Sequence, residues 1–321
     1  MRQSIIWIIV FTISLLVLVK ASDFFSDAIE KVGLFFRIPA FIIGLTLVTL
    51  GTTLPEMVSS IFAVLRNSSE IVAGTVIGSN ITNIFFILGI AIIFCEKKIE
   101  IDHDLLHVDL PLMVGSTFLL SMSVWNGIFT FKEAMISLLL FAVYILYNIS
   151  ASERERSKIL EKEIKNEARK EGELNFLTVL IILISAIFIY FGAKYTVESV
   201  IHLSYIFNIG KEIIAITAVA LGTSLPELAV GISFVRKGKG EIVVGNIMGA
   251  NMLNTLGVMG ISGIIGNIII PRNLILFSVP MMIIATLLFF FITQDKEITK
   301  WEGALLIIFY ILFLGKALAF I

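Results

Sequence analysis

Long apolar stretches separated by short polar segments make up most of the chain. An α-helix rises 1.5 Å per residue and the hydrocarbon core of a bilayer is about 30 Å thick, so about 20 apolar residues can cross it. Ten stretches fit this requirement, and they cover residues 4–20, 38–65, 71–94, 105–124, 128–149, 176–193, 212–235, 242–266, 273–293 and 302–320. The pattern predicts an all-α integral membrane protein with ten transmembrane helices.

The first stretch also has the outline of a signal peptide, because Arg2 precedes an apolar run. No small-x-small cleavage site follows this run, and Lys20 and Asp23 lead directly into further apolar residues. These features favour an uncleaved first span over a leader that is removed.

A hydrophilic segment, residues 152–173, divides the ten stretches into two sets of five. It carries seven Lys/Arg and seven Asp/Glu residues in helix-like alternation of sign. A segment this short, with so few apolar residues, cannot build a core of its own. We therefore expect residues 151–174 to be a solvated, charged linker and not a regulatory domain.

The two sets repeat each other in sequence. Residues 42–90 align without a gap on residues 213–261, at an offset of 171, with 21 of 49 positions identical. Each half, residues 1–150 and residues 175–321, has five predicted spans, so the second half enters the membrane upside down relative to the first. Inverted repeats bring equivalent segments together at the bilayer midplane, where secondary transporters hold their cargo.

Positive residues near span ends favour the cytoplasmic side. With the N-terminus outside, 17 of the 24 Lys and Arg residues become cytoplasmic: Lys20, Lys31, Arg37, Lys97, Lys98, the seven linker cations, Arg236, Lys237, Lys239, Lys296 and Lys300. The prediction is a multi-pass protein of the cell membrane with both termini extracellular and the linker cytoplasmic.

Composition excludes several classes of function. The chain is 58% apolar, and its formal net charge of −1 gives no basic surface for nucleic acid. Cys95 has no second cysteine with which to form an internal disulfide. His103 and His107 are four residues apart but lack a zinc-site pattern, so we interpret them as interfacial residues beside Asp102 and Asp104. We expect no resident cofactor and no protein partner.

The repeated motif places a carboxylate in each half at mid-membrane depth. LGTTLPE (Leu50–Glu56) aligns with LGTSLPE (Leu221–Glu227). Thr52 and Thr223 each precede the glutamate by four residues, which puts hydroxyl and carboxylate on one helix face. Pro55 and Pro226 lack an N–H, so each predicts a bend and a carbonyl freed from the helical ladder.

Hydroxyl, carbonyl and carboxylate oxygens form a ligand set suited to hard cations such as Ca²⁺ or Na⁺. A buried charge at this depth costs on the order of 3 kcal/mol, so each glutamate requires a polar cavity or a partner. For one Pro-kinked segment alone, a bent helix with a buried, protonated glutamate explains the pattern equally well. The repetition of Thr, Pro and Glu at identical spacing in both halves favours a cation site.

A second motif supplies amides. EIVAGTVIGSNITN (Glu70–Asn83) aligns with EIVVGNIMGANMLN (Glu241–Asn254), so Asn83 and Asn254 each follow their glutamate by 27 residues. The glycines at 74, 78, 245 and 249 form GxxxG pairs, which are typical of close helix packing. Asn80 and Asn251 either hydrogen-bond between helices or contact ions, and the sequence leaves both alternatives open.

These two motifs closely resemble the alpha-repeats of the sodium/calcium exchanger family, within the calcium/cation antiporter superfamily. The ten spans, the inverted five-plus-five repeat and the central charged loop extend the resemblance over nearly the whole chain. It implies that Glu56 and Glu227 ligate Ca²⁺ and compete for Na⁺. It further implies that the remaining ligands are Thr52, Thr53, Ser79, Asn83, Thr223, Ser224, Asn254 and the backbone carbonyls of Thr49 and Ala220.

The sequence departs from the family pattern at two positions. Many prokaryotic members resemble GSNxxD in the second repeat, whereas this chain has Ala250 for the serine and Asn254 for the aspartate. One hydroxyl and one acid are thus missing, which leaves the identity of the coupling ion open.

The expected function is a secondary antiporter that exchanges Na⁺ for Ca²⁺ by alternating access to one shared midplane site. A proton-coupled Ca²⁺ antiporter is the alternative within the same class, because burial favours protonated carboxyls. A membrane hydrolase with paired carboxylates is disfavoured, since no nucleophile elbow, zinc signature or Asp pair is present. A passive channel fits the inverted repeat less well than alternating access does.

Overall fold

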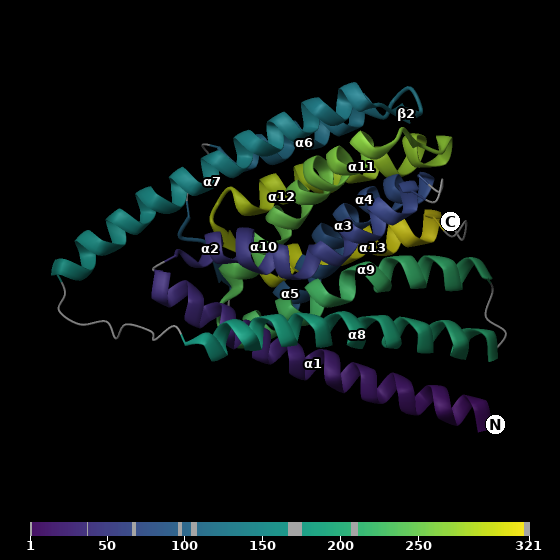
Figure 1. Ribbon diagram of the computed structural model, residues 1–321, viewed down its shortest axis with the longest axis horizontal. Coiled ribbons are helices and arrows are strands. Elements are labelled where there is room, and N and C mark those ends of the chain that lie inside the picture. Colours follow the sequence, from purple (N-terminus) through teal and green to yellow (C-terminus); the bar gives the residue numbers. More distant parts are fainter. Residues whose placement is uncertain are drawn as a thin grey trace.

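The computed structural model describes residues 2–36, 38–65, 69–95, 98–103, 108–165, 175–206 and 211–317. Elements up to the linker are α1 (Arg2–Phe36), α2 (Ala40–Ile43), the π-helical η1 (Gly44–Val48), α3 (Thr49–Leu65), α4 (Glu70–Thr82), the π-helical η2 (Asn83–Leu88), α5 (Gly89–Phe94), β1 (Ile99–Glu100), α6 (Asp109–Ser123), β2 (Ile128–Phe129) and α7 (Phe131–Lys165). After the linker come α8 (Phe176–Ile206), α9 (Lys211–Arg236), α10 (Gly240–Met252), the π-helical η3 (Leu253–Val258), α11 (Met259–Ile265), β3 (Ile268–Ile269), the π-helical η4 (Leu274–Ser278), α12 (Val279–Thr293), β4 (Glu297–Ile298) and α13 (Lys300–Ala317). The helices run roughly along one axis, and the start of α1 and the end of α13 lie at the same end (Figure 1).

Large apolar side chains cover much of the outer surface, while the carboxylates, hydroxyls and amides of the repeated motifs lie inside. Phe176 is 80% exposed and Leu146 65% exposed, while Thr53 is fully buried. In water such an outer surface would favour aggregation, whereas in lipid it is the expected surface of a spanning helix. The distribution confirms a multi-pass membrane protein.

Six described helical segments have the length and hydropathy of membrane spans: Ile5–Gly33, Glu70–Phe94, Phe131–Ser150, Phe176–Thr196, Gly240–Ile265 and Leu274–Thr293. A seventh is obtained if the bent pair Ala40–Thr53 and Glu56–Leu65 counts as one span. The expected spans 105–124, 212–235 and 302–320 overlap helices α6, α9 and α13, which are outside this set.

Three helices are longer than the apolar pattern predicts. α8 continues past the expected end at residue 193 to Ile206. α1 does not end near residue 20 but continues to Phe36, past Lys20 and Asp23. α7 runs through the start of the predicted linker to Lys165, and residues 166–174 lie outside the described residues. Charged residues do not interrupt an α-helix, because its backbone hydrogen bonds are all local.

The predicted bend in the second span is confirmed. Its two parts, Ala40–Thr53 and Glu56–Leu65, meet at an angle of 49°, with Pro55 at the junction. The bend lies immediately before Glu56.

Four two-residue strands, which the sequence pattern did not predict, connect the two halves. β1 pairs with β4 in antiparallel register, with Ile99 opposite Ile298, and β2 pairs with β3, with Ile128 opposite Ile269. Each pair therefore joins a residue before the linker to one after it.

Predicted cytoplasmic cations from distant parts of the chain gather near one end of the helices. Lys237 pairs with Asp27 at 2.8 Å, Lys239 with Glu30 at 3.2 Å, and Lys98 with Glu297 at 2.6 Å. Glu297 and Glu100 raise the pKa of Lys98 above its usual value. Lys98, Lys237 and Lys239 come from distant parts of the chain and each pairs with an anion, and Lys98 and Lys239 line the same cavity.

The α2–η1 segment packs against α10 with almost no side chains between the backbones. A Cβ atom on Gly245 would lie 2.1 Å from the carbonyl oxygen of Phe41, and one on Gly249 would lie 2.4 Å from that of Leu45. A Cβ on Gly44 would lie 1.9 Å from the Ile242 carbonyl oxygen. The predicted GxxxG packing is thus confirmed for residues 245 and 249.

This packing predicts that Gly245→Ala destabilises the protein by about 1–3 kcal/mol, because the added methyl group displaces the α2–η1 backbone. Thermal unfolding in detergent measures the loss. Gly78→Ala is the matched control, since a Cβ there meets nothing within 4 Å in the described part of the chain. Equal unfolding temperatures for the two variants would contradict the prediction.

Candidate cation site

The first carboxylate, Glu56, lies on α3 immediately after the bend. Glu56 is 7% exposed and Ser79, on α4, is 3% exposed. The Ser79 hydroxyl donates a hydrogen bond to Glu56 Oε1 at 3.2 Å. Two residues predicted from separate motifs are thus brought together at the centre of the first half.

The second carboxylate, Glu227, lies on α9 and is 2% exposed. It faces the hydroxyls of Thr52 and Thr53, which belong to the other half of the chain. Glu227 Oε2 and Thr53 Oγ1 have no hydrogen-bond partner at regular distance among the described residues. Oxygen atoms from both halves therefore meet in a buried volume, and two of them keep lone pairs that no regular hydrogen bond uses, an arrangement that suits a bound cation.

The Thr52 hydroxyl is already engaged as a donor. It donates to the carbonyl oxygens of Val48 at 3.2 Å and Thr49 at 3.4 Å. A hydroxyl whose hydrogen points back along its helix presents its lone pairs in the other direction. The oxygen of Thr52 is thus suited to accept a cation beside Glu227.

Three asparagines and a threonine link the two halves at the level of the second motif. Asn83 Nδ2 donates to Asn251 Oδ1 at 3.0 Å, and Asn251 Nδ2 donates to the Asn80 carbonyl oxygen at 3.3 Å. Asn80 Nδ2 donates to Thr255 Oγ1 at 2.7 Å. Asn80 and Asn251 therefore hydrogen-bond between helices, which is the first of the two alternatives that the sequence left open. Because the nitrogen of Asn83 is bound, its oxygen remains available to a ligand.

The sequence pattern did not reveal that the helices widen at these amides. η2 begins at Asn83, and Asn254 is the second residue of η3. π-helical turns often occur at functional positions because they leave backbone groups outside the regular ladder. Glycine and proline mark breaks in a sequence, but a π-helical turn has no comparable residue signal.

Of the remaining predicted ligands, the structure describes the side chains of three and not those of two others. Thr49, Ser224 and Asn254 are buried. Ser224 Oγ and Asn254 Nδ2 have no hydrogen-bond partner among the described residues. Thr223 and Ala220 lie on α9, but their side chains are outside the described part of the structure.

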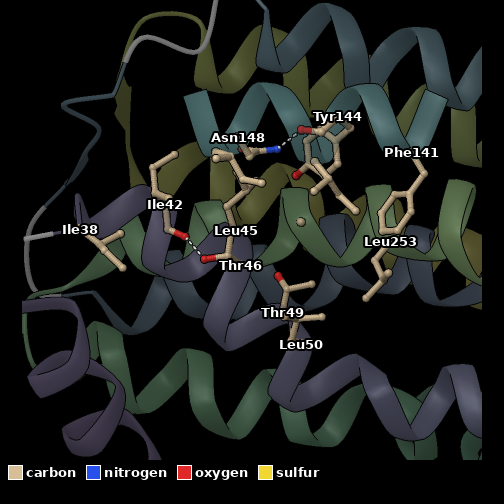
Figure 2. A pocket seen from close by; sticks show the side chains of 13 residues that line it. Ile38, Ile42, Leu45, Thr46, Thr49, Leu50, Phe141, Tyr144, Asn148 and Leu253 are labelled. Atoms are coloured by element: carbon tan, nitrogen blue, oxygen red, sulfur yellow. Dashed lines mark hydrogen bonds between the residues drawn. The ribbon is translucent and has the colours of Figure 1, made fainter. Parts of the chain in front are cut away.

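A lateral cavity of about 400 Å³ lies between the α2–η1–α3 segment and α7. Figure 2 shows Thr46, Thr49 and Leu50 on one wall, with Tyr144 and Asn148 on the other. The lining is largely apolar, and neither Glu56 nor Glu227 is part of it. The cavity adjoins Thr49 but is separate from the paired carboxylates.

His103 differs from its predicted interfacial position. It is 5% exposed, its Nε2 lies 2.9 Å from Asp109 Oδ2, and its ring stacks on Phe41 at 4.5 Å. Asp109 follows His103 by six residues, so no helical spacing pointed to the pair. His107 lies outside the described residues.

The donor set is made of hard oxygens with two carboxylates. Among the described residues, no group of three or more His, Cys, Asp or Glu side chains could hold a metal ion. A site of Glu, Thr, Ser, Asn and carbonyl oxygens matches Ca²⁺ and Na⁺ and does not match soft transition metals. Two negative charges balance one divalent ion.

Comparison with known proteins agrees with this chemistry. Residues 6–150 and 177–318 match the protein family described as sodium/calcium exchanger protein. The chain belongs to this family. Family membership makes the chain a transporter and not an enzyme.

The exchanger has relatives of similar length. It is 33% identical to the sodium/calcium exchanger MaX1 of Methanosarcina acetivorans, over 95% of this chain and 97% of that protein. It is 33% identical to the inner membrane protein YrbG of Escherichia coli, over 79% and 78% of the two chains. Its fold matches the solved structure of the sodium-calcium exchanger NCX_Mj with a TM-score of 0.80 and 24% identity, over 96% of this chain and 98% of that one.

The contact between Ser79 and Glu56 leads to a prediction about the exchanger. Ser79→Ala removes the hydroxyl that contacts Glu56, and we expect Ca²⁺ binding to weaken by about five-fold, the equivalent of one hydrogen bond. Calorimetric titration of the detergent-solubilised protein measures this change. Ser121→Ala is the control, because Ser121 is also buried but donates to the Thr117 carbonyl of its own helix. The same loss in both variants would show that the effect is not local to Glu56.

Proposed function

We propose that the protein is a secondary antiporter that exchanges Na⁺ for Ca²⁺ across the cell membrane, with one site that opens alternately to each side. The observation that carries the proposal is the meeting of Glu227 with the Thr52 and Thr53 hydroxyls of the opposite half. A site built from both halves changes whenever one half moves against the other, which is the requirement for alternating access.

Mutually exclusive occupancy follows from charge. The two buried carboxylates repel each other in a poorly solvated volume, so the empty site resists occlusion. One Ca²⁺, or several Na⁺, neutralises Glu56 and Glu227 and makes the occluded state accessible. Crossing then requires a cation in each direction, which gives exchange in place of leak.

The proposed ligands are Glu56, Glu227, Thr52, Thr53, Thr223, Ser79, Ser224, Asn83, Asn254 and the carbonyls of Thr49 and Ala220. Ca²⁺ prefers 6 to 8 oxygens at roughly 2.4 Å, and this set is large enough to provide them without a resident cofactor. Ca²⁺ and Na⁺ are cargo, and the proposal needs no protein partner.

The proposed architecture is ten spans in two inverted five-helix repeats, residues 1–150 and 175–321, joined by the cytoplasmic linker 151–174. Two observations support it. β1 pairs with β4 and β2 with β3, and exchanging β1 for β3 and β2 for β4 turns one pair into the other. Thr130 and Thr299 also cap α7 and α13 in the same way, through Glu133 and Glu302. The clustered cations support a cytoplasmic linker with extracellular termini.

A proton-coupled mechanism is the second candidate, and the absence of an acid at Asn254 favours it. With two carboxylates in place of three, the site has fewer groups to hold sodium. Protons can replace Na⁺ at Glu56 and Glu227 because burial favours the neutral carboxyl.

Transport in proteoliposomes tests the main proposal. We expect ⁴⁵Ca²⁺ uptake when vesicles loaded with Na⁺ are diluted into Na⁺-free buffer, and none when a pH gradient is the sole driving force. Glu56→Gln and Glu227→Gln should each abolish uptake, because an amide keeps the shape but removes the charge. Uptake driven by the pH gradient alone would select the proton-coupled candidate, and full uptake by either variant would refute the shared site.

A second prediction concerns the alanine that replaces a hydroxyl. Ala250→Ser restores an oxygen at the repeat position of Ser79, and we expect the Na⁺ concentration for half-maximal exchange to fall by about two- to five-fold. Ala250→Cys is the matched control, since sulfur has a similar size but is a poor ligand for Na⁺. Equal effects of serine and cysteine would attribute the change to packing.

A further inference from the structure

Asn246 is a buried amide that the sequence analysis did not single out. It lies on α10, one helical turn before Ala250, and is 1% exposed. Thr49 Oγ1, from the other half, lies 3.2 Å from Asn246 Oδ1 and 3.2 Å from the Asn246 carbonyl oxygen. The signal for it was available in the alignment, where an offset of 171 pairs Asn246 with Thr75 inside the second motif.

The Thr49 hydroxyl has more acceptors than it can satisfy. It also lies 3.0 Å from the Gly44 carbonyl oxygen, and its single hydrogen cannot serve three acceptors fully. Asn246 Nδ2, in turn, has no hydrogen-bond partner among the described residues. If the Asn246 side-chain amide is flipped so that Oδ1 and Nδ2 change places, Nδ2 donates to the Thr49 hydroxyl and that hydroxyl donates to the Gly44 carbonyl. The contact between the two side chains therefore persists in either orientation.

A chain of contacts leads from Asn246 to the second carboxylate. Asn246 contacts Thr49, and the Thr49 carbonyl oxygen accepts from the Thr52 hydroxyl at 3.4 Å. Thr52 in turn faces Glu227. The chain passes from the second half into the first and back again, and it includes a carbonyl and a hydroxyl that the proposed function assigns as ligands.

Thr49 lies between an apolar cavity and α10, so contacts with α10 set its position. On one side lies the apolar cavity of Figure 2, with Leu45 and Leu253 in its lining. On the other, α10 is so close that a Cβ on Gly249 would lie 2.4 Å from Thr49 Oγ1. Thr49 also begins α3 directly after the π-helical η1, where the helical ladder changes its spacing. A polar anchor at this residue fixes where the first turn of α3 begins.

The repeat does not supply an equivalent anchor. The position that corresponds to Thr49 is Ala220, which has no hydroxyl, and Asn246 corresponds to Thr75. The hydroxyl–amide pair is therefore specific to the α3 side of the site. Thr75 serves as the natural control position for any test of Asn246.

We propose that Asn246 is a positioning residue of the cation site, whose amide holds Thr49 so that the first-turn oxygens of α3 stand at ligand distance from the bound ion. The inference rests on the proposed function, since it assumes that the Thr49 carbonyl and the Thr52 hydroxyl bind cargo. It adds a residue that determines the affinity of the site without contacting the ion.

The test is the Ca²⁺ dependence of exchange in proteoliposomes for Asn246→Leu, Thr49→Val and the double variant. Leucine and valine keep the approximate shape and remove the hydrogen bond. We expect each single variant to raise the half-saturating Ca²⁺ concentration by roughly three- to ten-fold, with the maximal rate within about two-fold. The double variant should be no worse than the weaker-binding single variant, because both changes remove the same contact.

Two further variants separate positioning from general damage. Thr49→Ser keeps the hydroxyl and should recover most of the affinity that Thr49→Val loses. Thr75→Val, at the repeat-equivalent position of Asn246, should not change Ca²⁺ affinity. If Asn246→Leu fails to fold, the comparison of Thr49→Val with Thr49→Ser decides the outcome: a loss that serine recovers supports the pair, and equal affinities overturn it.

Unchanged affinity in folded Asn246→Leu, or additive losses in the double variant, would overturn the inference. Glu56→Gln in the same assay tells this failure apart from failure of the proposed function. If Glu56→Gln abolishes transport while Asn246→Leu has normal affinity, the positioning role alone is refuted. If Glu56→Gln still transports Ca²⁺, the shared cation site itself is refuted.

Discussion

Two carboxylates enclosed by an apolar bundle are the constraint around which this protein is organised. Removing a charged group from water costs several kcal/mol unless nearby groups or ions compensate for it. Glu56 accepts from the Ser79 hydroxyl, and Glu227 Oε2 and Thr53 Oγ1 have no hydrogen-bond partner within the part of the chain that the structure describes, which supports the proposed cation site. In the proposed mechanism, the same unfavourable charge that destabilises the empty site makes its occupancy a condition for movement.

Several polar contacts near the two carboxylates cross from one half of the chain to the other. Thr52 and Thr53 face Glu227, Asn83 bonds to Asn251, and Thr49 contacts Asn246, so these three contacts each join the two repeats. The glycines of α10 allow the backbones to approach closely enough for these short side chains to meet. A bundle held together only by long apolar side chains would keep the polar groups too far apart.

The two halves differ at positions where the sequence repeat is not identical, and these differences give them different polar contacts. Ala250 replaces the repeat of Ser79, and Ala220 replaces the repeat of Thr49. The α3 side therefore has a hydroxyl–amide anchor and a serine at its carboxylate, while the α9 side lacks both. Small differences of this kind change ligand positions by the strength of single hydrogen bonds, which is enough to tune affinity between two cations.

The apolar spans, the repeated motifs, the two glutamates and the bend at Pro55 are predictable from the sequence, because hydropathy, proline and identical spacing are local properties of the chain. The length of α1, the π-helical turns at Asn83 and Asn254, and the contact between Asn246 and Thr49 emerge only in the folded molecule. A π-helical turn has no residue signature, and residues 197 positions apart meet only after the backbones of α2–η1 and α10 have packed. This packing, and not the spacing along the chain, decides which polar groups hydrogen-bond to one another.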